Sequence, residues 1–322
     1  MHQEFDLHTI ATNDITVRAA VAGTGPLIVL VHGWPELWYS WRHQIKPLAD
    51  AGYRVVAPDV RGYGGSSKPD AVESYDMESL VGDVIGIIGA FEAETAILIG
   101  HDWGAPICWN TATLYPERIT AIANLSVPYH RRLDFSEIEL WRRLYGDGFF
   151  YQLYFQDEGV AEAELEADIR TALRQIYYAL SGDDPIRDRW LSHTRGQRLL
   201  DPFMDPSPFP DWLRETDIDY LVENYEASGF RGPLNRYRNA QRDYNNLPQI
   251  NATPLRQPSC FIGGGRDALR HFVPNHDLYE NVGRHCEDLR ISQIIDGAGH
   301  WIQQEAPEEV TATLLSFLET LD

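Results

Sequence analysis

Three residues stand where the chain could perform nucleophilic chemistry. Asp102 is the centre of GHDWG, Asp267 follows CFIGGGR, and His300 ends GAGH. Each follows a short apolar run of the kind expected for a buried strand. A glycine-flanked corner between a strand and a helix commonly carries a serine nucleophile, and here an aspartate occupies that place. The order along the chain is therefore nucleophile, acid, base.

A carboxylate at this corner predicts a substitution at an sp³ carbon. Its unperturbed pKa is about 4, so it needs no base to become a nucleophile. Attack by Asp102 would expel a leaving group and form an alkyl ester on the protein. His300, oriented by Asp267, would then activate water to hydrolyse that ester. The two leaving groups that suit such a carbon are a halide and the oxygen of a strained epoxide ring.

Ester hydrolysis also requires donors for the oxyanion that forms on the carbonyl. We expect one to be the backbone N–H of Trp103, which directly follows the nucleophile. The second is expected from the HGWP loop, at the backbone N–H of Trp34. An epoxide oxygen becomes a basic alkoxide, so a tyrosine hydroxyl that can donate to it would distinguish epoxide chemistry from halide chemistry.

The elements that must position these residues alternate between strands and helices. The apolar and alternating runs predict strands, and longer periodic stretches predict helices. The strands are expected at 15–23, 27–35, 53–59, 95–100, 118–128, 258–265 and 288–295, and the helices at 37–52, 77–91, 104–115 and 305–321. Such alternation predicts an α/β fold with a mostly parallel sheet and helices on both faces.

A different pattern separates two parts of this alternation. Residues 131–245 are helical in pattern, polar and rich in aromatic side chains, and the strand pattern resumes after them. We therefore predict a core formed by 1–130 and 246–322, with 131–245 inserted as a helical cap. The natural place for the cap is over the carboxyl ends of the strands, where such sheets bind ligands.

Composition excludes several classes of partner. The chain has 322 residues and a formal net charge of −21, which argues against nucleic acid and anionic membranes. No apolar stretch is long enough for a membrane span. Three cysteines without a CxxC pair indicate neither a disulfide framework nor a zinc site. We expect a cytoplasmic protein without metal or cofactor, and the sequence leaves a homodimer open.

Several segments resemble the soluble epoxide hydrolases of the α/β-hydrolase superfamily. They are HGWPELWYSWRHQI, DVRGYGGSSKP, GHDWGAP, FYQLYFQDEGVAEAELEADIR, SGFRGPLNRYRN and GAGHWIQQEAPEEV. The resemblance implies hydrolysis of a small apolar epoxide by water to a vicinal diol, through an alkyl-aspartyl ester. It also implies that Tyr151 and Tyr237 point at the oxirane oxygen and that Gln152 lines the substrate pocket. Trp34 departs from the family, which commonly has phenylalanine there, and its larger ring is expected to narrow the pocket. Trp34 and Trp103 are both expected to contact the substrate.

Three other functions compete with this one. A haloalkane or haloacid dehalogenase would share the nucleophile, the histidine and the tryptophan after Asp102, but the two tyrosines argue against it. A receptor that binds its ligand without turnover is disfavoured by the complete triad. A serine esterase is disfavoured because Asp102 takes the serine's place.

Overall fold

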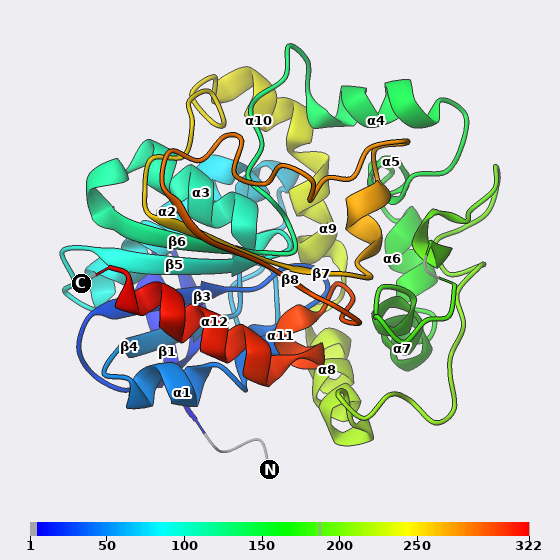
Figure 1. Cartoon of the computed structure of the whole chain (residues 1–322). Helices are drawn as coiled ribbons and strands as arrows, with labels where there is room; N and C mark the ends of the chain where they lie inside the picture. The colour runs from blue at the N-terminus through cyan, green and yellow to red at the C-terminus, as the bar shows by residue number, and fades with distance from the viewer. Residues whose placement is uncertain (1–4, 187, 322) are drawn as a thin grey trace.

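The computed structural model describes residues 5–186 and 188–321. Its sheet has eight strands in the order β1-β2-β4-β3-β5-β6-β7-β8 (Figure 1). The pairs β1–β2 and β2–β4 are antiparallel, and the remaining neighbours are parallel. The strands are β1 (Asp6–Thr12), β2 (Ile15–Ala22), β3 (Leu27–Val31), β4 (Arg54–Pro58), β5 (Ala96–His101), β6 (Ile119–Leu125), β7 (Ser259–Gly264) and β8 (Leu289–Ile295).

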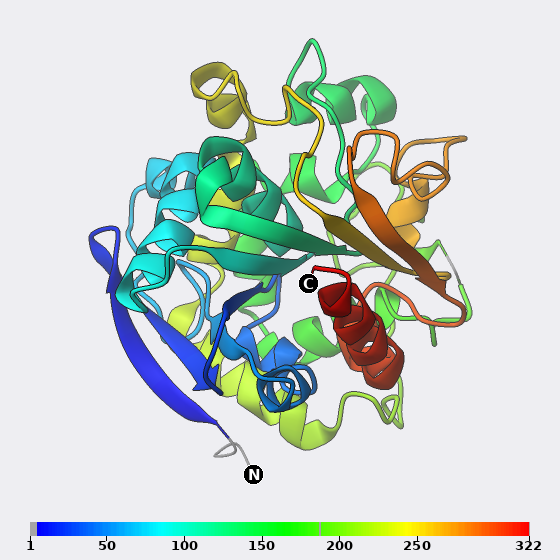
Figure 2. The same ribbon diagram turned by 60° about the vertical axis from the view of Figure 1, so that its left-hand side comes forward.

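Helices cover both faces of this sheet, as predicted. In Figure 1, α2 (Met77–Ala90) and α3 (Gly104–Leu114) lie on one side, and α1 (Ile45–Asp50) and α12 (Pro307–Glu319) lie on the other. Figure 2 shows α12 end-on beneath the strands. All five residues of β3 are buried: Ile28 and Leu30 belong to one apolar cluster, and Val29 to the other. A strand covered on both faces is therefore apolar throughout.

Two elements differ from the predictions. β1 was not predicted, because most of its side chains are exposed and its polar sequence carries no apolar alternation. The helix predicted over 37–52 is instead a 3₁₀ turn at Trp38–Trp41 followed by α1. Pro47 explains the break, since proline lacks the N–H of a helical turn and clashes with the carbonyl four residues earlier.

The helix predicted over 77–91 is confirmed as α2 despite its internal glycines. A Cβ on Gly86 would lie 1.7 Å from Thr12 Oγ1, and one on Gly82 would lie 2.6 Å from Asn13 Nδ2. These glycines therefore let α2 pack directly against the end of β1 and its turn. Glycine lowers the intrinsic stability of the helix at these positions, but it allows the close packing.

Only helices and loops connect β6 to β7 in the described part of the chain, and we call residues 126–258 the helical insertion. Figure 1 shows most of its helices gathered on one side of the molecule. They are α4 (Glu137–Tyr145), α5 (Tyr151–Tyr154), α6 (Val160–Leu165), α7 (Ile169–Ala179), α8 (Glu215–Ser228), α9 (Arg231–Arg238) and α10 (Ala240–Asn246).

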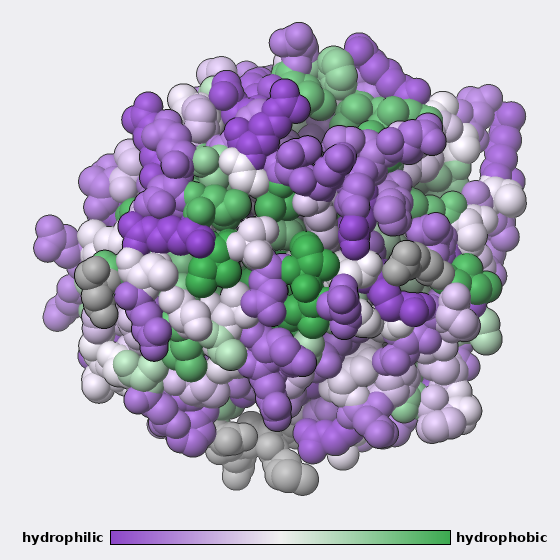
Figure 3. Space-filling model, in the orientation of Figure 1, coloured by the Kyte–Doolittle hydropathy of each residue, from purple (hydrophilic) through white to green (hydrophobic). Residues whose placement is uncertain are grey.

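The face of the molecule seen in Figure 3 carries mostly hydrophilic residues with scattered apolar patches. Among the described residues, no helix is both long enough and apolar enough to cross a membrane.

Candidate active site

The predicted nucleophile lies on a strained corner at the end of β5. Asp102 has a φ of +49°, an unusual value for a residue with a side chain. The turn is tight because its neighbours are glycines: a Cβ on Gly104 would lie 1.9 Å from the Val31 carbonyl oxygen, and one on Gly100 would lie 2.3 Å from the Gly104 carbonyl oxygen. The corner thereby lifts the carboxylate away from the sheet, above its edge.

The HGWP loop holds one oxygen of this carboxylate. The backbone N–H of Trp34 donates a 2.8 Å hydrogen bond to Asp102 Oδ1. A Cβ on Gly33 would lie 2.3 Å from that same oxygen, so the loop can approach only with glycine at this position. His32 supports the loop, with Nδ1 2.8 Å from the Gly33 carbonyl and Nε2 accepting from Val60 N–H.

The other carboxylate oxygen faces the predicted base. His300 Nε2 lies 3.4 Å from Asp102 Oδ2, and its Nδ1 lies 3.0 Å from Asp267 Oδ2. Asp267 also accepts a hydrogen bond from the Leu269 backbone N–H, and the Tyr279 hydroxyl lies 2.8 Å from its Oδ2. The three residues predicted from the sequence therefore meet, and Tyr279 joins them without having been predicted.

The charges at this cluster set the protonation of His300. Burial alone would lower the pKa of His300, but the negative charges of Asp267 and Asp102 and their hydrogen bonds raise it well above its ordinary value. Burial opposes ionisation of Asp267 too, yet the charge of His300 and its N–H and O–H donors lower the pKa of Asp267. The resting cluster therefore favours an imidazolium between two carboxylates.

Buried polar groups fix the loop that carries His300. The backbone carbonyl oxygen of His300 lies 2.8 Å from His101 Nε2 and accepts a hydrogen bond from Ser126 Oγ. The backbone N–H of His300 donates to the Leu180 carbonyl. His101 Nδ1 in turn lies 2.7 Å from a carboxylate oxygen of Glu36. His101 and Glu36 therefore hold the backbone of this loop and do not face the cavity.

Glu305 joins the same loop to the helical insertion. Its carboxylate accepts backbone hydrogen bonds from Gly299 and Trp301, which flank His300, and from Gly182 in the insertion. Burial raises the pKa of Glu305 to about 7. Sequence reasoning missed this residue, because a glutamate that begins a predicted helix gives no sign of such distant partners.

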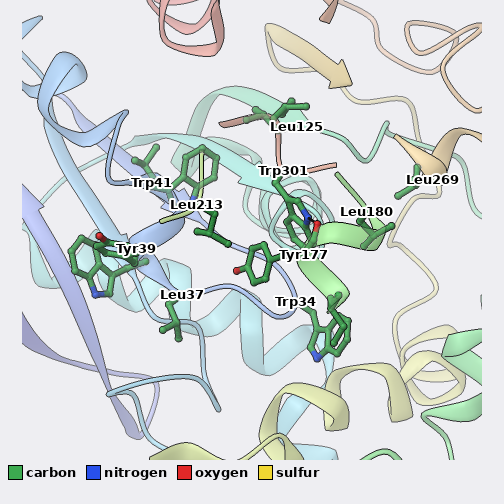
Figure 4. Close-up of a cluster of buried hydrophobic side chains, with 14 of the residues drawn as sticks. Trp34, Leu37, Tyr39, Trp41, Leu125, Tyr177, Leu180, Leu213, Leu269 and Trp301 are labelled. Carbon is green, nitrogen blue, oxygen red and sulfur yellow. Dashed lines mark hydrogen bonds between the residues drawn. The ribbon is translucent and has the colours of Figure 1, made fainter. Parts of the chain in front are cut away.

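The helical insertion brings both predicted tyrosines to the nucleophile. Tyr151 begins α5 and Tyr237 lies in α9, and their ring centroids are 5.8 Å apart. A narrow cavity of about 20 Å³ is lined by Trp34, Asp102, Tyr151, Leu180, Trp190, Tyr237, Leu269, Phe272 and His300. Trp34, Leu180 and Leu269 are seen in Figure 4. Burial raises the pKa of both tyrosines far above neutrality, so both hydroxyls keep their protons.

Two tryptophans of the core lie beside Tyr237: Trp34 lines the narrow cavity, and Trp103 lines the larger channel next to it. The Trp34 ring packs edge-on to Tyr237 at 6.2 Å, and the Trp103 ring does so at 5.3 Å. Trp103 is the N-cap residue of α3, directly after the nucleophile. The Trp34 N–H already contacts the carboxylate, whereas the Trp103 N–H remains a predicted donor.

A larger apolar channel leads away from the nucleophile. It has a volume of about 350 Å³ and runs between the insertion and the core. Asp102, Tyr151 and Gln152 lie among its lining residues, together with Trp141 and Leu140 of α4. Gln152 lines this channel, and its contact with substrate stays a prediction. The apolar lining suits a hydrocarbon substituent better than a charged one.

Two nearby tyrosines in the insertion point to other partners. The Tyr154 hydroxyl donates to Glu164, and the Tyr244 ring stacks on the Arg132 guanidinium. Within residues 5–186 and 188–321, no group of three or more His, Cys, Asp or Glu side chains is placed to hold a metal ion.

Comparison with known proteins places this site in a family. The alpha/beta hydrolase fold family matches residues 26–307. Epoxide hydrolase A of Mycobacterium tuberculosis is 40% identical over 317 residues, covering 97% of each chain. The crystal structure of epoxide hydrolase A from Mycobacterium thermoresistibile matches with a TM-score of 0.91 and 41% identity over 98% of each chain. An epoxide hydrolase from an endophytic Streptomyces gives a TM-score of 0.93 and 41% identity over 99% of this chain and 96% of that one.

The chain belongs to the α/β-hydrolase fold family, and within it to the epoxide hydrolases. It is accordingly a hydrolytic enzyme.

Proposed function

We propose that this enzyme converts an epoxide and water into a vicinal diol through a covalent ester on Asp102. The observation that carries the proposal is the composition of one cavity: a carboxylate, an imidazole and two tyrosine hydroxyls all line it. The carboxylate and imidazole come from the sheet edge, and the tyrosines come from the helical insertion. We propose that residues 131–245 act as the cap that closes this cavity, within a cytoplasmic protein.

In the first step, Asp102 Oδ2 attacks one carbon of the ring while Oδ1 stays bound to the Trp34 N–H. The C–O bond of the ring breaks, and its electron pair goes to the ring oxygen. The hydroxyls of Tyr151 and Tyr237 donate hydrogen bonds to that oxygen as its charge grows. Because burial keeps the pKa of both hydroxyls high, they act as hydrogen-bond donors to that oxygen. The proton of the resting His300 imidazolium passes to the ring oxygen, which becomes an alcohol and leaves His300 neutral for the second step. At the end of the cycle the regenerated carboxylic acid of Asp102 returns a proton to His300.

In the second step, neutral His300 removes a proton from water, and the water oxygen attacks the ester carbon of Asp102. The oxyanion on Oδ1 is stabilised by the backbone N–H groups of Trp34 and Trp103. Collapse breaks the bond from the carboxyl carbon to the alkyl oxygen, and the imidazolium returns a proton to that oxygen. The diol therefore leaves with one oxygen that belonged to Asp102.

The test is diol formation from a panel of apolar epoxides, styrene oxide among them, with wild-type protein and Asp102→Asn. Diol from the wild type and none from fresh variant supports the reaction and its nucleophile together. Diol at equal rates from both proteins would reject Asp102 as nucleophile.

Dehalogenation is the second candidate, because indole rings at positions 34 and 103 flank the carboxylate and suit a halide. Halide release from chloroalkanes without any diol from epoxides would favour it. The two tyrosines favour the epoxide, since an alkoxide needs stronger donors than a halide does.

A further inference from the structure

A chain of two hydrogen bonds ends on the hydroxyl of Tyr151. The indole Nε1–H of Trp141 in α4 donates to Gln152 Oε1 at 3.0 Å. The Gln152 Nε2–H in turn donates to the Tyr151 hydroxyl oxygen at 3.0 Å. Sequence reasoning assigned Gln152 only to the pocket wall and did not single out Trp141.

The chemistry of the three groups fixes the direction of this chain. An indole nitrogen donates and never accepts, so the amide oxygen of Gln152 must face Trp141. The amide NH₂ group therefore faces Tyr151, whose oxygen must accept. A tyrosine hydroxyl has one hydrogen, and that hydrogen is then free to point into the cavity that Asp102 lines.

We propose that Trp141 and Gln152 are positioning residues that aim the hydroxyl hydrogen of Tyr151 at the leaving oxygen of the substrate. The proposal rests on the proposed epoxide hydrolysis and concerns its first step alone. Each bond of the chain withdraws electron density from the next acceptor, so Tyr151 also becomes a better donor. In agreement, the bond from Gln152 acts against the burial that raises the pKa of Tyr151.

The chain is held rigidly enough for this role. Trp141 is only 8% exposed, and its ring packs against Phe150 with centroids 4.4 Å apart. Phe150 stacks on Tyr145 at 4.5 Å, and the Tyr145 hydroxyl donates to the Phe272 carbonyl of the core. The donor end of the chain is therefore fixed by an aromatic stack that is anchored outside the insertion.

One substitution should reverse the chain rather than merely break it. In Gln152→Glu, the carboxylate still accepts from Trp141, but its other oxygen can only accept from Tyr151. The Tyr151 hydrogen would then turn away from the cavity. Gln152→Leu removes both bonds and leaves the hydrogen free to rotate, so the glutamate should be the more harmful change although it is nearer in shape.

The experiment measures ester formation and ester hydrolysis separately, in single turnovers, for wild type, Trp141→Phe, Gln152→Leu and Gln152→Glu. Ester formation should slow about tenfold in Trp141→Phe and Gln152→Leu, as expected for loss of one supporting hydrogen bond, and further in Gln152→Glu. Ester hydrolysis should change less than twofold. Gln175→Leu is the control. The side-chain amide of Gln175 donates a hydrogen bond to the Phe203 carbonyl, and Gln175 does not line the cavity. Thermal unfolding of each variant checks that the fold is kept.

The same substitutions, made in the Tyr151→Phe background, distinguish orientation of the Tyr151 hydroxyl from a merely structural role of Trp141 and Gln152. Without the hydroxyl, Trp141→Phe and Gln152→Leu should slow ester formation no further. An equal slowing in that background would overturn the proposal, as would equal effects of Gln152→Leu and Gln152→Glu. A wild type that forms neither diol nor an Asp102 ester would instead reject the proposed function itself, so the two failures have different signatures.

Discussion

Nε2 of His300 lies 3.4 Å from Oδ2 of Asp102, the oxygen that attacks the substrate in the proposed mechanism. This short separation couples the two chemical steps. The negative charge of Asp102 helps to raise the pKa of His300, and ester formation removes that charge. The imidazole therefore becomes easier to deprotonate at the moment when a base is needed.

Asp102→Asn should accordingly lower the pKa of His300, since it imitates the neutral ester. The ring should stay protonated to a higher pH in the wild type than in the variant. NMR titration of the histidine resonances measures both values. Asp296→Asn, an exposed change after β8, is the control and should leave the pKa of His300 unaltered. A higher pKa in Asp102→Asn would contradict the coupling.

His300→Ala should stop the reaction at the ester, because the nucleophile is intact and the base is missing. Intact-protein mass spectrometry should show one added epoxide mass per chain, with less than one turnover of diol. The double variant Asp102→Asn/His300→Ala should show no adduct. Turnover by His300→Ala at the wild-type rate would refute the assigned role.

Gly33→Ala should disable the enzyme by displacing the nucleophile. The new Cβ would lie 2.3 Å from Asp102 Cβ and Oδ1, so one of the two residues must move. A displacement of about 1 Å costs on the order of hundredfold in rate. Gly89→Ala in α2 is the matched control: no atom lies within 4 Å of its added methyl. It should keep full activity and gain about 0.5–1 kcal/mol in free energy of unfolding.

Tyr279→Phe should slow ester hydrolysis more than ester formation. The Tyr279 hydroxyl helps to hold Asp267, which orients His300, and His300 acts as a base in the second step of the proposed mechanism. Loss of a hydrogen bond worth about 1 kcal/mol predicts a slowing of about fivefold. Transient kinetics should show more ester at steady state than in the wild type. Tyr154→Phe, which loses a hydroxyl bonded to Glu164, should show wild-type kinetics.

Glu305 should make stability depend on pH. Burial raises the pKa of Glu305 to about 7 in the folded state, above its value of about 4.5 in the unfolded chain. The folded state therefore holds this proton more tightly, and the resulting stabilisation is present below pH 4.5 and is lost as pH rises towards 7. Urea unfolding of wild type and Glu305→Gln should show the wild type losing stability relative to the variant across that interval. If the difference in free energy of unfolding between the two proteins stayed constant over this pH range, the raised pKa of Glu305 would be contradicted.

The meeting of Asp102, Asp267 and His300, the proposed catalytic residues, could be predicted because local sequence marks each of them. Asp102, Asp267 and His300 each follow a strand of the parallel sheet, and the carboxyl ends of such strands meet at one edge. The order of these residues along the chain and their positions after strands were therefore sufficient to predict that they lie close together. Tyr151 and Tyr237 could be chosen only through the resemblance. The sequence pattern of an aromatic residue on a cap helix is the same whether the side chain packs in the core or faces the substrate.

The supporting residues could not be predicted, since their roles depend on distant partners. Tyr279 reaches Ser126 across 153 positions of sequence, and Glu305 reaches Gly182 across 123. Trp141 has the periodicity of an ordinary apolar helix face, and only the position of its indole nitrogen reveals the bond to Gln152. β1 was not predicted for a different reason. It is an exposed edge strand and lacks the apolar alternation that identifies a strand.

The helical insertion gives the enzyme a modular chemistry. In the proposed mechanism, the groups that attack carbon and hydrolyse the ester lie at the ends of sheet strands, whereas the two hydroxyls that face the departing oxygen come from α5 and α9. These two sets are encoded in separate stretches of the gene. Exchange of the insertion alone could therefore redirect the same nucleophile from one type of leaving group to another, with the hydrolytic half of the cycle inherited unchanged.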